Sequence, residues 1–376
     1  MIIKNGNVLN DSFKFETTDI EISGQKIAKI DKNITSDEVI DGTDCYVVPG
    51  FVDTHMHGAM GEEFISYNDN TFEKIASYEA QHGTTSLVPA ISAGVKEELL
   101  TAIRNMKKCV QTELDDCAKV WGLHMEGPFF SVAFKGAHKP ENIRNTDIVE
   151  FKELYNEADG ILKIMTLAPE LPGAEEVVRY ATENGVCISA GHTSATCDEL
   201  KKSVEWGVKL GTHLFNAMSP LKHREPGAVG GILYEDIKCE LICDFYHVRP
   251  EAISLVYRLK GREKINMITD SILAAGLPDG DYIEHNQSIH VVNGQSRLDD
   301  GTINGGTSCL VDGVRNLVSI GIPLEDACMM ASKNPAQTVG IYDKTGSITE
   351  GKLADIVVLD KELNLKHVIL RGKKLF

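Results

Sequence analysis

The sequence predicts an α/β protein, built as a barrel of eight parallel strands wrapped by helices and joined to a small β domain. Two observations support this prediction. The middle of the chain alternates short apolar segments with amphipathic helical stretches, which is the pattern of repeated βα units. Both ends contain alternating strands separated by turns such as Asn5-Gly6. The 376 residues suffice for one large barrel and a minor domain.

Eight apolar strands are expected in the middle of the chain. They lie near residues 47–57, 85–90, 120–126, 162–168, 186–192, 210–214, 241–247 and 265–270. Eight βα units spread over about 300 residues fit a (β/α)8 TIM barrel. We assign residues 49–345 to this barrel, and residues 1–48 plus 346–376 to a β-sandwich domain formed by both chain termini. Residues 276–305 are long for a βα loop, and their alternating pattern suggests an inserted hairpin over the barrel mouth.

Composition and charge exclude several classes of function. The formal net charge of −17 argues against a nucleic-acid or anionic-membrane partner, which would need a basic face. No segment approaches the roughly 18 apolar residues of a membrane span. The nine cysteines form no C-x-x-C pair, so we interpret them as reduced and mostly buried. These features predict a soluble, cytoplasmic protein.

Metal-ligand residue types recur where the expected strands end. His55 and His57 are two apart, so both side chains face the same way on a strand. Glu126, His192 and His213 end three further strands, which a barrel brings together. Any one of these histidines alone is more often a core or surface residue. Together they predict a site for Zn²⁺ or Fe²⁺, with an open position for a water molecule.

A carboxylate also ends the eighth expected strand. Asp270 would lie beside a water bound to the metal, where it can take a proton and return it to a leaving nitrogen. The alternative is a structural aspartate that caps the following segment. His124 lies two residues before Glu126, and we expect it to point into the barrel core as a structural residue.

Several motifs together resemble the N-acetylglucosamine-6-phosphate deacetylases, a family of the amidohydrolase superfamily. The motifs keep that family's order across nearly the whole chain, and as a set they are specific. They are PGFVDTHMHG (49–58), GLHMEGPF (122–129), KGAH (135–138), AGHT (190–193), THLFNAM (212–218), REPG (224–227), DFYH (244–247), TDS (269–271) and ADIV (354–357).

The resemblance implies hydrolysis of N-acetyl-D-glucosamine 6-phosphate to D-glucosamine 6-phosphate and acetate, a reaction of amino-sugar catabolism. It implies a metal held by Glu126, His192 and His213, with metal-activated water as the nucleophile and Asp270 as the acid/base. His138 would contact the acetamide carbonyl and stabilise the oxyanion. The two first-strand histidines would allow a second metal, so we expect one or two divalent ions per subunit.

The resemblance also implies a phosphate site made by Asn216, Ala217, Arg224 and His247. Arginine suits this role because it binds phosphate bidentately, and the backbone N–H groups at 216–217 add neutral donors. In the family, the arginine that matches Arg224 reaches in from the neighbouring subunit. A homodimer and a small-molecule phosphosugar are therefore the expected partners.

Three alternative interpretations remain open on the sequence. The galacto epimer, N-acetylgalactosamine 6-phosphate, differs by the orientation of one hydroxyl group, which the sequence does not decide. A cyclic-amide amidohydrolase would usually carry a modified lysine at the end of the fourth strand, but here Ala168-Pro169-Glu170 follows that strand. A non-catalytic barrel that serves as a scaffold is disfavoured because every proposed ligand and Asp270 are present.

Overall fold

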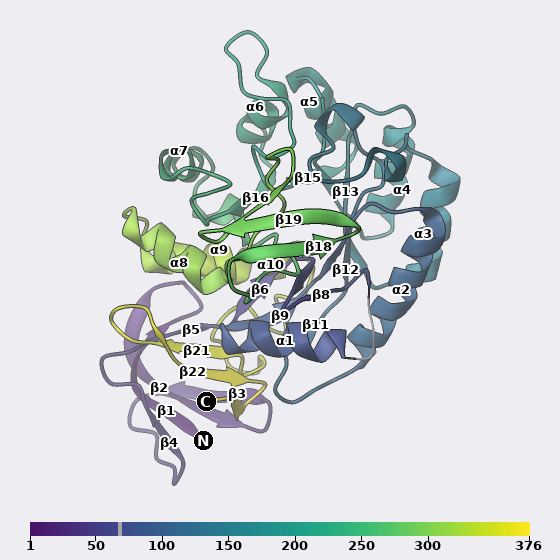
Figure 1. Ribbon diagram of the computed structural model, residues 1–376. Helices are drawn as coiled ribbons and strands as arrows, with labels where there is room; N and C mark the ends of the chain where they lie inside the picture. Colours follow the sequence, from purple (N-terminus) through teal and green to yellow (C-terminus); the bar gives the residue numbers. More distant parts are fainter. Residues whose placement is uncertain (67–69) are drawn as a thin grey trace.

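Parallel strands form a barrel in the computed structural model, which describes residues 1–66 and 70–376 (Figure 1). Its strands are β6 (Phe51–Asp53), β9 (Thr84–Leu87), β10 (Ala90–Ile91), β11 (Lys119–Val120), β12 (Leu123–Glu126), β13 (Leu162–Leu167), β14 (Cys187–Ala190), β15 (Val208–Gly211), β16 (Lys238–Ile242) and β17 (Ile265–Ile268). They pair in parallel as β6-β9-β11 and as β10-β12-β13-β14-β15-β16-β17. The second barrel strand is divided into β9 and β10, and the third is divided into β11 and β12. The predicted fold class is confirmed.

The barrel closes between its last and first strands through backbone hydrogen bonds just beyond β17 and β6. The Asp270 N–H donates to the His55 carbonyl at 2.9 Å, and the His57 N–H donates to the Ser271 carbonyl at 2.7 Å. Closure therefore uses the two candidate ligands His55 and His57 and the candidate acid/base Asp270. The carboxyl ends of the strands meet at one mouth, as in other barrels of this kind.

Helices cover the outside of the barrel (Figure 1). They are α1 (Thr71–Gln81), α2 (Lys96–Gln111), α3 (Ile148–Ala158), α4 (Ala174–Glu183), α5 (Cys197–Trp206), α6 (Gly227–Tyr234), α7 (Pro250–Lys260), α8 (Leu310–Ser319), α9 (Leu324–Ala331) and α10 (Lys333–Thr338). In α2 the buried residues Leu99, Ala102, Ile103 and Met106 recur at helical spacing, so one face packs on the strands. No helix in the described part of the chain is long and apolar enough to cross a membrane.

The two termini share a second sheet, drawn in purple and yellow in Figure 1. It contains β1 (Ile2–Leu9), β2 (Phe15–Ser23), β3 (Lys26–Asp31), β4 (Val39–Asp41), β5 (Tyr46–Pro49), β21 (Ile356–Leu359), β22 (Leu365–Leu370) and β23 (Lys373–Lys374). β21 pairs antiparallel with β5 and so joins the two ends of the chain. Ile20, Val47 and Ile356 are fully buried in its own apolar core.

Besides the divided second and third strands, the first and seventh expected strands differ from the observed ones. Two strands, β5 and β6, replace the single strand expected at residues 47–57, and the second of them ends at Asp53. Gly50 lies between them, where a Cβ would be 2.2 Å from the Thr85 hydroxyl oxygen. His55 and His57 follow β6, so the strand alternation expected to turn both side chains the same way does not apply to them. The seventh barrel strand ends at Ile242 rather than at His247. The Asp244 carboxylate accepts hydrogen bonds from the Tyr246 and His247 N–H groups at 2.8 and 2.9 Å, which favours a turn over a continued strand.

The insertion after the eighth barrel strand is a three-stranded antiparallel sheet rather than a hairpin. Its strands are β18 (Gly280–Glu284), β19 (Gln287–Val292) and β20 (Gln295–Leu298). Ile289 and Val291 of this sheet pack with Ile272 and Leu273, which follow β17. Figure 1 shows the insertion in green across the barrel, and its β18–β19 turn lines the cavity described below.

Candidate active site

Glu126, at the end of β12, lies at the centre of a buried group of imidazoles. Its Oε1 atom is 3.1 Å from Nε2 of His192 and 3.1 Å from Nε2 of His213. The two Nε2 atoms are also 3.1 Å apart. The structure thus brings together the three residues predicted to hold one metal.

These spacings are within hydrogen-bond range and are also close to those of ligands that share one metal ion. Ligands held at about 2.0–2.1 Å in a tetrahedron lie about 3.3 Å from one another. Burial lowers the pKa of His192 to about 4, so its ring is neutral at pH 7 and offers a lone pair. Its Nδ1 lies 3.0 Å from the Phe134 carbonyl, which can accept the ring proton and leave Nε2 free to bind.

His55, His57 and Asp270 form the adjoining half of the site. Nε2 of His57 is 3.2 Å from Oδ1 of Asp270, and Nε2 of His55 is 3.5 Å from the same oxygen. The two rings also approach Glu126, each at 3.4 Å. Nε2 of His55 is buried and has no hydrogen-bond partner among the described residues. An orphaned nitrogen beside two carboxylates fits a second cation position.

The carboxylates give this half of the site a strong negative potential. Burial alone would raise the pKa of Asp270, but His55 and His57 hold it well below its ordinary value. Burial alone would lower the pKa of His55. The carboxylates of Glu240, Asp270 and Glu126 outweigh this effect and raise its pKa above the ordinary value. The buried negative charge therefore needs cationic neighbours, and a divalent ion would meet the same need.

His138 lies on the loop after β12, which includes the short 3-10 turns η1 (Val132–Phe134) and η2 (Pro140–Asn142). Its Nε2 is 3.3 Å from Oε2 of Glu126, whereas His192 and His213 approach the other carboxylate oxygen. The imidazole thus borders the site beyond the strand ends. Its side chain remains partly exposed.

Several strand-end residues have a left-handed backbone. The φ angles of His192, His213 and Asp270 are +47°, +29° and +50°. This conformation is unfavourable for a residue other than glycine and persists where surrounding contacts enforce it. At each of these positions the backbone turns away from the direction of the preceding strand, while the side chain lies at the barrel mouth. Local strain at three strand ends is typical of a functional site.

A cavity of about 490 Å³ opens at the barrel mouth. Most predicted site residues line it, namely His57, Glu126, His138, His192, His213, Asn216, Ala217, His247 and Asp270. The cavity therefore connects the residues expected to bind metal with the residues expected to bind phosphate. His55 lies below it, fully buried.

One wall of the cavity contains three of the residues expected from the sequence to hold phosphate, namely His247, Asn216 and Ala217. Nδ1 of His247 is 2.7 Å from Oδ2 of Asp244, and although burial opposes a charge, this carboxylate raises the pKa of His247. The Ala217 N–H makes no hydrogen bond to another described residue, and Asn216 borders the same space. The raised pKa favours a proton on both ring nitrogens of His247, and with the free N–H of Ala217 this would give the wall two hydrogen-bond donors.

Arg224 stands apart from these residues. It lies on the exposed loop between β15 and α6 and does not line the cavity of its own chain. Some apolar side chains on this loop, on α6 and on α7 are also exposed, namely Leu221, Tyr234, Leu255 and Leu259. Leu221 packs beside Gly230 of α6, which ties the loop to that helix.

Sequence reasoning missed several residues of the site. Ser92 lies 3.1 Å from Nδ1 of His57, and Glu63, Glu284 and His285 line the cavity. His285 lies in the β18–β19 turn, where its Nε2 is 3.2 Å from Glu63. No motif marks these positions. Glu240 did carry a signal, because a carboxylate inside the apolar segment 239–243 is costly to bury.

The chain matches the amidohydrolase family over residues 46–375. It is 35% identical over 377 residues to the N-acetylglucosamine-6-phosphate deacetylase of Lysinibacillus sphaericus, a match that covers 99% of this chain and 97% of that protein. It is 33% identical over 327 residues to the N-acetylgalactosamine-6-phosphate deacetylase of Escherichia coli O157:H7, covering 86% of each.

A solved structure agrees with these sequence matches. A mutant of the N-acetyl-D-glucosamine-6-phosphate deacetylase from Mycobacterium smegmatis, in complex with N-acetyl-D-glucosamine-6-phosphate, superimposes with a TM-score of 0.94. The identity is 30%, and the match covers 100% of this chain and 99% of that one. The chain belongs to the amidohydrolase family and, within it, to the N-acetylglucosamine-6-phosphate deacetylases.

Proposed function

We propose that this chain hydrolyses the acetamide of N-acetyl-D-glucosamine 6-phosphate, giving D-glucosamine 6-phosphate and acetate. The observation that supports this best is the shared cavity, which joins a buried carboxylate–imidazole cluster to the wall at His247 that is expected to hold phosphate. A phosphorylated amide fits both ends of such a cavity. The two relatives described above are named as deacetylases of N-acetylated sugar phosphates, which are substrates of this class.

Glu126, His192 and His213 would hold a divalent metal, and His55 and His57 would hold a second one together with the neighbouring carboxylates. The donor set is imidazole and carboxylate, which suits Zn²⁺ or Fe²⁺. When bound, such an ion polarises a carbonyl group and lowers the pKa of a coordinated water to about 7.

Asp270 moves the proton in the proposed reaction. Its depressed pKa keeps the carboxylate ionised at neutral pH, so Oδ1 can accept a proton from the attacking water. The water oxygen bonds to the acetyl carbon, and His138 donates to the developing oxyanion. The C–N bond then breaks as Asp270 returns the proton to the amine nitrogen.

The phosphate binds at the other end of the cavity. The His247 ring, whose pKa Asp244 raises, would supply one donor when protonated, and the backbone N–H of Ala217 would supply another. The Asn216 side chain already donates to the His213 carbonyl at 3.2 Å, so it braces the turn next to a metal ligand as well. Binding the phosphate here orients the acetamide toward Glu126 and Asp270.

A homodimer completes this site in the proposal. Arg224 lies on an exposed loop outside the cavity of its own chain, and Leu221 on the same loop is also exposed. A second copy packed against this loop would cover Leu221 and carry Arg224 toward the phosphate of its neighbour. A reducing compartment such as the cytoplasm is also part of the proposal, because all nine cysteines are free.

The galacto epimer is the second candidate substrate. One observation favours it: a relative named for N-acetylgalactosamine 6-phosphate is 33% identical over 86% of the chain. The two sugars differ only at C4, so phosphate and acetamide contacts would serve both. We propose the gluco substrate first because a relative that matches 99% of this chain is named as an N-acetylglucosamine-6-phosphate deacetylase.

Acetate release from the phosphorylated gluco sugar tests the proposed function. Zinc-loaded protein should release acetate and free amine in equal amounts, and a chelator should stop the reaction. Protein with a measured metal content that releases neither product from either epimer would overturn the proposal. A cyclic amide should remain intact in the same assay.

A further inference from the structure

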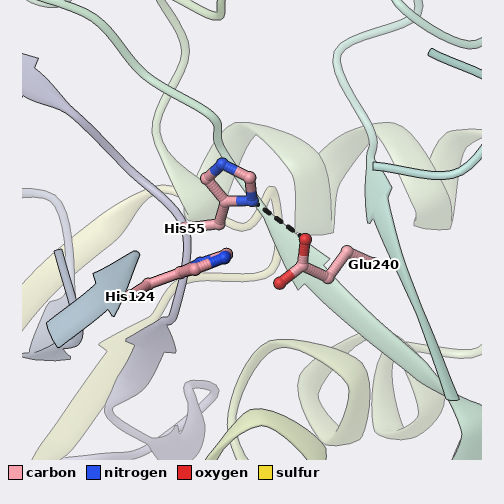
Figure 2. A group of neighbouring side chains, drawn as sticks. All are labelled: His55, His124 and Glu240. Atoms are coloured by element: carbon pink, nitrogen blue, oxygen red, sulfur yellow. Dashed lines mark hydrogen bonds and ion pairs between the residues drawn. The ribbon is translucent and has the colours of Figure 1, made fainter. Parts of the chain in front are cut away.

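Glu240 lies below the cavity and holds a first-strand histidine from the seventh strand of the barrel. Oε2 of Glu240, on β16, is 2.9 Å from Nδ1 of His55, and both side chains are fully buried (Figure 2). The two residues are 185 positions apart in the sequence. Nothing in the proposed reaction uses Glu240, because it does not line the cavity.

His124 lies in the same cluster but is not available as a ligand. Its Nδ1 is 3.0 Å from the Thr54 carbonyl, so it donates there, and its Nε2 accepts from the Thr166 hydroxyl at 2.8 Å. Burial and then the charge of His55 hold its pKa well below the ordinary value, so the ring is neutral. It packs edge-on against His55 with ring centroids 4.4 Å apart. The structural role expected from the sequence agrees with these contacts.

The Glu240 contact determines which nitrogen of His55 faces the site. Because Nδ1–H donates to Glu240, Nε2 is the atom that remains for a ligand. That nitrogen points toward Glu126 and Asp270, at 3.4 and 3.5 Å, and has no hydrogen-bond partner among the described residues. A carboxylate behind the ring also makes the imidazole a stronger donor to a metal.

The same residue braces a second predicted ligand. Oε2 of Glu240 accepts a hydrogen bond from the His213 N–H at 3.3 Å, and the Glu240 carbonyl accepts from the Leu214 N–H at 2.9 Å. These bonds hold the backbone of His213, whose φ of +29° is unfavourable. Glu240 therefore connects the ligands at the ends of the first and sixth strands.

The cost of burying Glu240 argues that it has a function. Its side chain forms an ion pair only with His55 among the described residues, and its Oε1 has no hydrogen-bond partner there. A charged group with so little compensation destabilises an apolar interior, where leucine would pack more favourably. A benefit to the site would offset this cost.

We propose that Glu240 is a positioning residue that fixes the His55 ring with Nε2 toward Glu126 and Asp270, and thereby preorganises the second divalent-metal position. This inference rests on the metal site of the proposed function. Glu240 touches neither substrate nor metal in this account and acts through His55.

Metal affinity of Glu240 variants tests the proposal directly. Zinc stoichiometry and affinity would be measured by competition with a chromophoric chelator, and the visible spectrum would be recorded for Co²⁺-loaded protein. Glu240→Leu should weaken one of two metal positions by about 10- to 100-fold and change the Co²⁺ spectrum. Glu240→Gln keeps an oxygen that accepts the Nδ1 proton, so its loss should be smaller, and it serves if the leucine variant does not fold.

Glu79→Gln provides the matched control. Glu79 is an equally buried glutamate, but it lies on α1 and does not line the cavity. Its substitution should leave metal affinity and the Co²⁺ spectrum unchanged. Unaltered affinity and spectrum in a folded Glu240 variant would overturn the proposal, and so would equal losses in the Glu79 variant.

A double-mutant cycle separates positioning from a general structural role. If Glu240 acts on the second metal position through His55, then Glu240→Gln should cause no further loss of affinity at that position in a His55→Ala background. An undiminished effect in that background would contradict the proposal. Metal content and affinity that do not change on His55→Ala would also contradict it. Acetate release by wild-type protein is scored separately, so failure of the proposed function and failure of this inference give different results.

Discussion

Asp270 and His55 are linked twice across the closure of the barrel. The Asp270 N–H donates to the His55 carbonyl at 2.9 Å, and Oδ1 of Asp270 lies 3.5 Å from Nε2 of the same histidine. The backbone bond closes the sheet between its last and first strands. The same closure places the proposed acid/base beside a proposed metal ligand without any flexible loop between them. Catalytic geometry here therefore depends on the barrel itself.

Replacing Asp270 by asparagine should remove the proton carrier while preserving the shape of the site. We expect kcat to fall by about 10²- to 10⁴-fold, because a positioned acid/base contributes that much. Zinc should still bind, since Glu126, His192 and His213 are unchanged. Steady-state kinetics and metal analysis of Asp270→Asn check this. Normal turnover in this variant would exclude Asp270 as the acid/base.

Arg224→Ala should mainly impair binding of the phosphorylated substrate. A lost charge-assisted contact to phosphate should raise KM by about tenfold to a hundredfold with a smaller effect on kcat. Lys222→Ala, on the same exposed loop, is the matched control and should behave as wild type. An unchanged KM in the Arg224 variant would remove this residue from the phosphate site.

Mixing two impaired proteins should restore activity if Arg224 acts across a dimer. In a mixed dimer of the Asp270→Asn and Arg224→Ala chains, one of the two sites has a normal aspartate and receives a normal arginine. Random exchange of subunits should then recover about a quarter of wild-type activity at low substrate. Recovery would be measured after co-refolding or co-expression. Activity no greater than the sum of the separate variants would contradict sharing of the site.

Metal loading should stabilise the folded chain as well as activate it. Glu126 and Asp270 place negative charge in a buried site, and bound cations would relieve their repulsion. Free Zn²⁺ at about 100 times its Kd should add about 2.7 kcal/mol to the free energy of unfolding. Thermal melting with and without Zn²⁺ measures this. The His213→Ala variant should show a smaller increase, and an equal increase would place the ion elsewhere.

Glu79 should make the protein less stable as the pH rises. Burial, and then the neighbouring Asp53, raises the pKa of Glu79 to about 8, whereas an unfolded glutamate has a pKa of about 4.3. Between these values the folded chain keeps a proton that the unfolded chain has released, so the free energy of unfolding falls with increasing pH.

Glu79→Gln should remove this dependence. Relative to wild type, the variant should gain at least about 1 kcal/mol of stability between pH 5 and pH 8, because a tenfold difference in proton affinity between the folded and unfolded chains is worth about 1.4 kcal/mol. Urea unfolding at both pH values measures the change. An equal fall of stability in the two proteins would show that Glu79 does not titrate in this range.

The barrel and the meeting of its proposed metal ligands were predictable because parallel βα units repeat along the chain. Once the strands are aligned, their carboxyl ends meet, so Glu126, His192 and His213 must approach one another. The resemblance to a family then added roles that geometry alone does not assign. One of these roles is that of Arg224 in the site of a neighbouring subunit. Its exposed position in the structure is consistent with that role.

The remaining features depend on contacts that have no local signature. Glu240 meets His55 across 185 residues, and only the cost of a buried charge marks it in the sequence. The seventh strand was expected to reach His247, but the Asp244 side chain ends it with a turn. His285 enters the cavity through the β18–β19 turn, and the position of that turn over the barrel depends on tertiary packing.

The most direct test compares three substrates in one assay: N-acetylglucosamine 6-phosphate, its galacto epimer and the unphosphorylated sugar. Free amine would be measured with zinc-loaded wild-type protein. We predict the highest kcat/KM for the phosphorylated gluco sugar and little turnover of the sugar without phosphate. Equal turnover with and without phosphate, or none of any sugar by metal-loaded protein, would contradict the account.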